Sequence, residues 1–309
     1  MHRVAVIDVG TNSVLYLMAE MTKDGRISTF HQDALSVRLG KKLAGKGTIQ
    51  NESLNELIKV LKKYKKLGEK DNVTNLIAVG THVFRSAVNR DEILKKIKEE
   101  VGLKIEILSE KEEAEWSYRG ALQGRNLTGK ILMADIGGGS TEIVLGRNNV
   151  IMDLRSLKIG AVGLTEKFIH HDPPLETECS LIEKSASHHL KNSAELLLEQ
   201  GEQFIGVGGT VTTLAAMALH LEEYQPMAVD GFTMTLTDIR KMLEKLRQLP
   251  LSQRKKLLKL DPKRADIIIA GTIILERIMT LGSFEKIIVS DQGLRFGIAL
   301  REFSLAYEF

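Results

Sequence analysis

Two segments of the chain, residues 4–13 and 131–140, carry the same residue types in the same order, and those types could bind phosphate. Each segment has an apolar run, a carboxylate and a turn of small residues that ends in a hydroxyl residue. The matching residues stand 127 positions apart in three pairs, Asp8 and Asp135, Gly10 and Gly137, and Ser13 and Ser140. Glycine lets an anion approach the backbone closely, and hydroxyl groups donate further hydrogen bonds to phosphate oxygens. The duplication therefore predicts two phosphate-binding turns.

The residues of these turns are the predicted phosphate ligands, because each turn offers several backbone N–H groups as well as hydroxyl groups. They are Gly10, Thr11, Asn12, Ser13, Gly137, Gly138, Gly139 and Ser140. The structural alternative is two tight hairpins whose turn residues only satisfy one another. A single turn would favour that alternative, whereas the duplication favours binding.

A third glycine-rich turn, Gly208-Gly209-Thr210, stands between a predicted strand and a predicted helix. The N–H groups at a helix N-terminus have no acceptor within the helix and carry partial positive charge, which suits an anion. Close packing of a helix on a strand also selects glycine. Binding and packing therefore explain this turn equally well.

Three carboxylates near the repeated turns, Asp8, Asp135 and Glu142, are the predicted metal ligands. Carboxylate oxygens suit Mg²⁺ or another divalent cation, which would bridge to phosphate oxygens. Glu142 follows Ser140 by two residues on a predicted strand, so the two side chains should share one face. A divalent cation, with Mg²⁺ first, is the expected cofactor.

Four glutamates crowd the start of one predicted helix, at Glu110, Glu112, Glu113 and Glu115. The helix dipole favours carboxylates there by about 0.3–1 kcal/mol each, which is a sufficient structural explanation. A carboxylate that follows a strand could instead orient and deprotonate a water molecule. The pattern alone does not select one of the four.

Basic residues at other positions could contact an anion. Arg85 follows a predicted strand and could bind a phosphate bidentately, although a surface arginine on a helix explains it somewhat better on this evidence alone. Arg38, Lys41, Lys42 and Lys46 form a glycine-bearing basic loop that could steer a polyanion. Such runs of charge are usually solvated surface.

The elements predicted for the first half place these residues at strand ends. Strands are expected at residues 4–7, 14–19, 27–37, 76–79 and 104–108, and helices at 54–68, just after Thr81, at 91–100 and at 112–122. Gly68 is expected to end the first of these helices. This order is typical of a mixed sheet flanked by helices, and residues 123–126 are typical of a linker.

The second half opens in the same way. Strands are expected at residues 130–135, 141–146, 150–157, 203–207 and 286–289, and helices at 163–171, 175–199, 211–220 and 262–282, with a last helix after the segment 290–297. Asp261 is the expected N-cap, and the apolar segment 267–275 predicts a buried helix. We expect two related α/β domains, 1–124 and 125–309, with the last helix able to pack back on the first and a cleft between them.

Length and composition favour a two-domain soluble protein. The chain has 309 residues, which exceeds the usual size of a single core, about 250 residues. Its 43% hydrophobic and 27% charged content is typical of a soluble globular protein. A formal charge of +3 does not by itself indicate nucleic acid, and no nucleic-acid partner is expected. The single cysteine, Cys179, fits a reducing compartment, and no apolar run suits a signal or a membrane span. We therefore expect a cytoplasmic protein.

Six segments together resemble the exopolyphosphatase and guanosine pentaphosphate phosphatase (Ppx/GppA) family of the actin-like ATPase superfamily. The segments are 8–13, 80–85, 112–114, 135–142, 208–210 and 290–297, and the segment 135–142 is the most specific. The resemblance covers nearly the whole chain. It implies two ribonuclease-H-like domains, each a mixed sheet flanked by helices, with the active site in the cleft between the domains. The chain resembles the short, two-domain form of the family.

The resemblance also implies roles for individual residues. It identifies Glu113 as the residue that activates water and Arg85 as a catalytic arginine that contacts phosphate. Asp135 and Glu142 match the divalent-metal region of the family. Two positions depart from the family pattern, because Glu115 stands where an arginine is common and Phe296 stands where an acidic residue is usual. These departures bear on substrate contacts rather than on the reaction class.

The function we expect is hydrolysis of the terminal phosphate of inorganic polyphosphate by metal-assisted attack of a water that Glu113 activates. A guanosine pentaphosphate 5′-phosphohydrolase is the first alternative, and an actin-like sugar kinase is another enzyme alternative. A non-catalytic polyphosphate or nucleotide sensor and a filament former are the non-enzymatic alternatives, against which the carboxylates beside the turns argue. The expected partner is polyphosphate or guanosine pentaphosphate, no membrane is expected, and a two-fold homodimer is the base-rate expectation.

Overall fold

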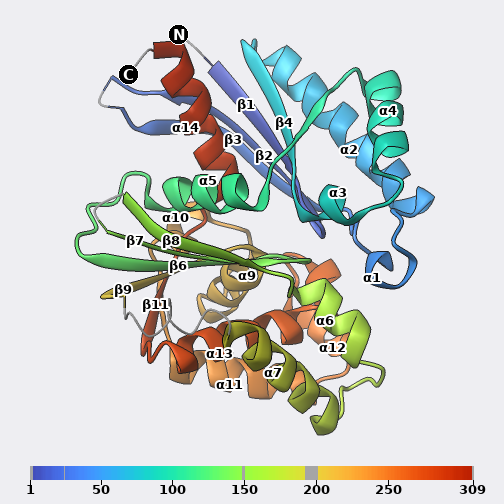
Figure 1. The fold of residues 1–309 in the computed structure, drawn as a ribbon, viewed down its shortest axis with the longest axis vertical. Coiled ribbons are helices and arrows are strands. Elements are labelled where there is room, and N and C mark those ends of the chain that lie inside the picture. The colour runs from blue at the N-terminus through green and yellow to red at the C-terminus, as the bar shows by residue number, and fades with distance from the viewer. Residues whose placement is uncertain (1–2, 24, 148–149, 192–200, 308–309) are drawn as a thin grey trace. The chain divides into compact units, whose positions relative to one another are not determined.

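The computed structural model describes residues 3–23, 25–147, 150–191 and 201–307. The chain forms two compact units, residues 1–126 together with 292–309 (unit 1) and residues 127–291 (unit 2) (Figure 1). The expected second domain, 125–309, included the last helix with the option of packing on the first domain. In the structure residues 292–309 belong to unit 1.

Unit 1 is built on a five-stranded mixed sheet of order β3-β2-β1-β4-β5. The strands are β1 (Arg3–Val9), β2 (Ser13–Met21), β3 (Ile27–Ser36), β4 (Asn75–Gly80) and β5 (Ile105–Ile107). The first three strands form an antiparallel meander, and β4 and β5 run parallel to β1. The helices are α1 (Leu43–Lys46), α2 (Asn51–Lys70), α3 (His82–Ser86), α4 (Arg90–Val101), α5 (Glu110–Leu122) and α14 (Leu294–Tyr307).

Helices cover both faces of this sheet, so β1 is apolar on both sides. Ala5 and Ile7 of β1 pack in one core with residues of α2 and α4, whereas Val4 and Val6 pack in a second core with α14. A strand buried on both faces reads as a continuous apolar run, which is the pattern of residues 4–7. The two cores fix the end of β1, from which the first turn projects.

Unit 2 repeats this plan with a sheet of order β10-β11-β9-β6-β7-β8. The strands are β6 (Lys130–Ile136), β7 (Thr141–Arg147), β8 (Val150–Leu157), β9 (Gln203–Val207), β10 (Thr233–Thr235) and β11 (Lys286–Val289). The helices are α6 (Ala161–Phe168), α7 (Glu176–Lys191), α9 (Gly209–Ala218), α10 (Pro226–Val229), α11 (Leu236–Gln248), α12 (Leu251–Leu257), the 3₁₀ turn η1 (Pro262–Arg264) and α13 (Ile268–Leu281). The order β8-β7-β6-β9-β11 matches β3-β2-β1-β4-β5. The two related mixed sheets flanked by helices confirm the predicted fold class.

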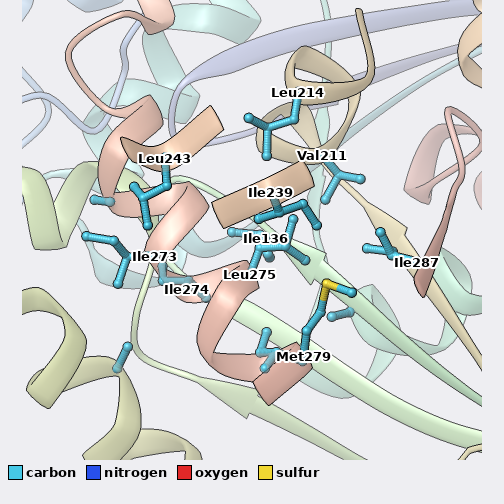
Figure 2. Packing of buried hydrophobic residues seen from close by; sticks show 14 of the residues in the cluster. Ile136, Val211, Leu214, Ile239, Leu243, Ile273, Ile274, Leu275, Met279 and Ile287 are labelled. Carbon is cyan, nitrogen blue, oxygen red and sulfur yellow. The ribbon is translucent and has the colours of Figure 1, made fainter. Parts of the chain in front are cut away.

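Helix α13 lies in the core of unit 2, where its side chains meet residues of α9, α11 and the sheet (Figure 2). Residues 268–276 are all buried, which confirms the prediction of a helix buried on all faces. Its predicted start at Pro262 is wrong, because Asp261 does not cap the helix. Instead the Asp261 carboxylate accepts a 2.9 Å hydrogen bond from Arg264 Nε, and α13 begins at Ile268.

Several other boundaries differ from the predictions. Gly68 does not end α2, which continues to Lys70, and a methyl group at Gly68 would lie 3.7 Å from the Tyr16 hydroxyl. Helix α7 is described to Lys191, and the remainder of the predicted helix, 192–199, lies outside the described residues. The elements between residues 226 and 257 were not predicted. In the described part of the chain, no helix is long and apolar enough to cross a membrane.

Candidate functional site

The turn between β1 and β2, residues 10–12, is closed by one backbone hydrogen bond, from Gly10 N–H to Ser13 O at 3.0 Å. Thr11, Asn12 and Ser13 are all buried. Asn12 donates through Nδ2 to Ser13 Oγ at 3.2 Å, while its buried Oδ1 has no hydrogen-bond partner in the described structure. The turn is therefore closed by its own hydrogen bonds, and the Asn12 Oδ1 acceptor is left unsatisfied.

The turn between β6 and β7, residues 137–140, reproduces this geometry. Gly137 N–H donates to Ser140 O at 3.0 Å. The carbonyl groups of Gly137 and Gly138 accept hydrogen bonds from the start of α6, and any side chain at Gly160 would collide with Gly138 and Gly139. Among the described residues, the N–H groups of Gly138 and Gly139 donate to no protein acceptor, and both glycines are partly exposed. The turn thus presents two adjacent backbone donors, as a phosphate site requires.

The two turns differ in the residue opposite the aspartate. In unit 2, Asp135 pairs across the antiparallel ladder with Glu142, and in unit 1 the corresponding partner of Asp8 is Leu15. Directly opposed residues project from the same face of a sheet. Unit 2 therefore places two carboxylates together, whereas the equivalent place in unit 1 holds one carboxylate and one leucine.

The Asp135 and Glu142 pair fits a divalent cation that keeps most of its ligands as water and phosphate oxygens. Mg²⁺ is commonly held by one or two carboxylates together with water and phosphate oxygens. Glu142 is buried and its Oε1 accepts a 2.9 Å hydrogen bond from Ser156 Oγ, which orients the carboxylate. Within the described residues, no three His, Cys, Asp or Glu side chains form a metal cluster.

Arg85 and Glu113 meet in unit 1 at the ends of neighbouring parallel strands. Val9, Gly80 and Ile107 lie in register at the carboxyl ends of β1, β4 and β5. The first turn follows β1, α3 follows β4 and α5 follows β5, so all three segments leave the same edge of the sheet. Residues far apart in sequence are thereby brought to one place.

The Arg85 guanidinium contacts Glu113 through one nitrogen. Arg85 Nη1 lies 2.7 Å from Glu113 Oε2 and donates to Leu108 O at 2.8 Å. The contact with Glu113 is a close ion pair. Arg85 Nε and Nη2 are buried and donate to no described residue. These two nitrogens form one edge of the guanidinium, which can hold two oxygens of an anion side by side.

The structure separates the roles of the crowded glutamates. Ser109 and Glu112 form a reciprocal capping box, in which Glu112 Oε2 accepts from Ser109 N–H at 2.8 Å and from Ser109 Oγ at 2.7 Å. These hydrogen bonds, first from the side chain and then from the backbone of Ser109, lower the pKa of Glu112. Glu112 is thus a structural cap, and Glu113, one residue on, is the carboxylate that faces Arg85.

The third glycine-rich turn lies beside Asp135 in unit 2. Val207 pairs with Asp135, and a side chain at Gly208, whose φ is +92°, would collide with the Asp135 carboxylate and with Ile136 O. Gly209 begins α9, and a methyl group there would overlap the Arg264 guanidinium. Close packing explains both glycines. This packing places the third turn against Asp135 and Ile136, which directly precede the second turn.

Arg264 is a site residue that sequence reasoning missed. It is mostly buried, it is held by Asp261 and its guanidinium covers Gly209 at the N-terminus of α9. It sits in a segment that was interpreted as the first turn of a helix. The sequence has no local signal for its contact with Gly209, which is 55 positions away.

The two departures from the family pattern have structural roles. Glu115 forms an i,i+4 ion pair with Arg119 on α5, with a closest distance of 2.9 Å. Phe296 is buried and packs in the α14 core of unit 1 with Ile298 and Phe303. Phe296 is therefore part of a hydrophobic core.

Comparison with known proteins agrees with this geometry. The family model described as "Ppx/GppA phosphatase family" matches residues 18–305. Exopolyphosphatase 2 of Mycobacterium tuberculosis H37Rv is 31% identical over 96% of this chain and 98% of its own length. The bifunctional 3-dehydroquinate synthase/phosphatase of Fusobacterium nucleatum is 33% identical over 96% of this chain, which spans only 46% of that longer protein.

Solved structures give the same result. The Aquifex aeolicus member of the Ppx/GppA family is 34% identical with a TM-score of 0.82, and the match covers 99% of both chains. An exopolyphosphatase from Cytophaga hutchinsonii is 28% identical with a TM-score of 0.90 over 98% of this chain and 97% of its own. With its repeated turns, its paired Arg85 and Glu113 and these matches along nearly its whole length, the chain belongs to the Ppx/GppA phosphatase family.

Proposed function

We propose that this protein is an exopolyphosphatase, which hydrolyses the terminal phosphoanhydride bond of inorganic polyphosphate. The observation that carries the proposal is the pairing of Arg85 with Glu113. It joins an arginine edge with two unbonded donors to a carboxylate, at the same sheet edge as the first turn, whose residues are predicted phosphate ligands. The family match supports the same reaction class, and we also propose that the protein is cytoplasmic.

In the proposed reaction Arg85 binds and Glu113 moves a proton. Nη1 of Arg85 stays with Glu113 and Leu108 O, while Nε and Nη2 donate to two oxygens of the terminal phosphate. The Glu113 carboxylate accepts a proton from a water molecule, and the water oxygen forms a bond to phosphorus as the bridging P–O bond breaks. One inorganic phosphate and a chain shorter by one phosphate are the products.

The backbone N–H groups of the turns, and a cation held by the unit 2 carboxylates, would stabilise the negative charge of phosphate in this proposal. Phosphoryl transfer depends mainly on positioning and on electrostatic stabilisation of phosphate oxygens. The N–H groups of Gly138 and Gly139 would donate to phosphate, while Asp135 and Glu142 would hold a divalent cation. When bound, that cation would supply positive charge at phosphate oxygens.

Replacement of Glu113 by glutamine tests the proposal directly. Glutamine keeps the shape of the side chain but does not accept the water proton, so kcat for phosphate release should fall by about 10²–10⁴-fold. The matched control is Glu112→Ala, which removes half of the capping box. It should lower the free energy of unfolding by about 0.5–2 kcal/mol and leave kcat unchanged.

The assay measures phosphate release from polyphosphate and from guanosine pentaphosphate, with and without Mg²⁺. A higher kcat/KM for guanosine pentaphosphate would instead identify a pentaphosphate phosphohydrolase. Near-normal turnover of Glu113→Gln would refute the assigned role of Glu113. Tight polyphosphate binding without any phosphate release by the wild-type protein would identify a sensor.

A further inference from the structure

The segment 38–47 is a basic segment of unit 1 that follows β3. It contains Arg38, Lys41, Lys42 and Lys46 and has no acidic residue, so its formal charge is +4. Two other ten-residue segments are as basic or more so, 59–68 with +5 and 250–259 with +4. The segment 38–47, which we call the basic loop, is singled out by its contact with the first turn rather than by its charge alone.

The basic loop is attached directly to the first phosphate-binding turn of unit 1. Gly40 N–H donates to Thr11 O at 2.8 Å, and the N–H groups of Val37 and Arg38 both donate to Asn12 O at 3.0 and 2.7 Å. A methyl group at Gly40 would overlap the Thr11 side chain, so only glycine allows this approach. Lys41 directly follows Gly40, which contacts the turn.

The backbone of the basic loop is fixed rather than free to move away from the turn. Leu39 and Leu43 are buried in the unit 1 core and anchor the loop at two points. Two residues beyond the loop, Ile49 is also buried, and its backbone makes two 3.0 Å hydrogen bonds with the Asn89 side chain. Lys42 adopts a left-handed conformation, φ +63°, which costs free energy in a residue other than glycine.

The lysines of the loop are exposed to solvent, and two of them have no ion-pair partner among the described residues. Lys41, Lys42 and Lys46 are exposed, and within the described residues Lys41 and Lys46 take part in no ion pair. A rigid backbone that presents lysines beside a phosphate-binding turn is suited to a linear anion that extends beyond that turn. Some helix lysines of this unit pair with glutamates, as Lys59 does with Glu56.

We propose that the basic loop is a second binding subsite for polyphosphate, which holds phosphate units beyond the terminal one and sets the preference for chain length. The inference rests on the proposed function, because it names the part of the substrate that the loop contacts. The loop contributes to binding of long chains and not to the chemical step. A substrate of three phosphates would gain little from it.

The test compares a triple variant, Lys41→Gln, Lys42→Gln and Lys46→Gln, with a matched control, Lys66→Gln, Lys70→Gln and Lys98→Gln. The control removes the same charge from exposed lysines on α2 and α4 that form no ion pair among the described residues. Lys70 lies about 28 Å along α2 from the end nearest the loop. Any effect of net charge alone should be equal in the two proteins.

For long polyphosphate, the triple variant should raise KM by about tenfold or more with an unchanged kcat, and the dependence of KM on salt should weaken. For tripolyphosphate, KM should change less than about threefold, since few phosphates reach the loop. The control should behave as wild type with both substrates. An equal loss for both chain lengths, an equal loss in the control, or no loss would overturn the subsite.

A binding measurement separates this inference from the proposed reaction. Fluorescence anisotropy with labelled long polyphosphate, measured on the Glu113→Gln protein, reports the loop without turnover. Loss of binding only when the loop lysines are removed would support the subsite. This result would stand even if the wild-type protein released no phosphate, an outcome that would overturn only the exopolyphosphatase proposal. Equally tight, lysine-dependent binding of a single-stranded oligonucleotide of matched charge would instead assign the loop to nucleic acid.

Discussion

At the scale of single residues, the two turns show how one duplicated framework can hold different chemistry. The offset of 127 positions relates the turn hydrogen bonds, Gly10 to Ser13 and Gly137 to Ser140, and also the strand registers beneath them. The one functional difference at the register position is Leu15 against Glu142. A single side chain therefore distinguishes a turn with one carboxylate at its base from a turn with two.

Arg85 allows a test of how the arginine edge is used. Arg85→Lys keeps a positive charge beside Glu113 but removes the paired donors Nε and Nη2. We expect kcat/KM for polyphosphate to fall by about 10–100-fold, because the single ammonium group of lysine does not replace two adjacent guanidinium donors. This loss corresponds to about 1.4–2.8 kcal/mol of transition-state stabilisation. Steady-state kinetics measure the change.

The matched control for that variant is Arg119→Lys on α5. Arg119 forms an ion pair with Glu115 on an exposed helix surface, where such pairs contribute little. Its kcat/KM should stay within about twofold of wild type. If Arg85→Lys did the same, the side-on edge of Arg85 would have no part in phosphate binding.

The sequence predicted the residues of the site better than it predicted their partners. The repeat identified both turns, because a spacing of 127 positions is visible without a structure. It did not show that Arg85 and Glu113 touch, since that contact depends on two parallel strands being neighbours. Choosing Glu113 over Glu112 required the resemblance, and the capping box now supplies the physical reason.

At the scale of elements, the link between α6 and α7 is held by one buried carboxylate. Glu178 Oε1 accepts hydrogen bonds from His171 and from His170 N–H, and Oε2 accepts from Leu175 N–H, at 2.8–2.9 Å. Burial alone would raise the pKa of Glu178, but these hydrogen bonds outweigh it and lower the pKa to about 2. The link should therefore be sensitive to acid.

We expect Glu178 to make the stability of unit 2 depend on pH in the acid range. Because its pKa is lower in the folded state, the stabilisation is complete above about pH 4.5 and is lost as the pH falls towards about 2. The full effect is about 3 kcal/mol, since one pKa unit corresponds to about 1.4 kcal/mol. Urea unfolding at several pH values measures it.

Glu178→Gln is the comparison for that experiment. This variant removes the ionisable group, so its free energy of unfolding should be lower than that of wild type at neutral pH and should change less between pH 5 and about 2.5. The His171 ring, which is mostly exposed, makes one of the hydrogen bonds to the Glu178 carboxylate. Identical pH dependence in the two proteins would exclude Glu178 as the source.

Strands were predicted more accurately than helix ends. The bounds of β9 and β11 match the predictions because each is an apolar run between turn residues. The region from residue 226 to 257 was missed, although α11 has a capping box of Thr235 and Asp238 and an apolar spacing of Ile239, Leu243 and Leu246. The start of α13 was misplaced because Asp261 bonds a side chain instead of the helix backbone.

At the scale of the whole molecule, the chain leaves unit 1, forms unit 2 and returns to unit 1 for its last helix. Helix α14 packs closely on α5, where a methyl group at Gly297 would overlap Trp116 O and one at Gly120 would overlap Gly293 O. It also covers the face of β1 that carries Val4 and Val6. Unit 1 is therefore complete only when the end of the chain has folded onto its beginning.

This connectivity predicts that a cavity in α14 destabilises unit 1 specifically. Phe296→Ala should lower the free energy of unfolding of unit 1 by about 3–5 kcal/mol, because Phe296 is 3% exposed and packs against the sheet. Hydrogen exchange followed by mass spectrometry should show faster exchange in β1, β2 and β4. Exchange in β6, β9 and α13 should stay unchanged, since their core contains no residue of α14.

Phe30→Ala is the control on the same unit, because Phe30 is 50% exposed on the edge strand β3 and its removal leaves no buried cavity. Its exchange should resemble that of wild type. Equal acceleration in both units of the Phe296→Ala protein would mean that they unfold as one cooperative body. Faster exchange confined to unit 1 would mean that each unit has a core that unfolds independently, although unit 1 includes the last helix of the chain.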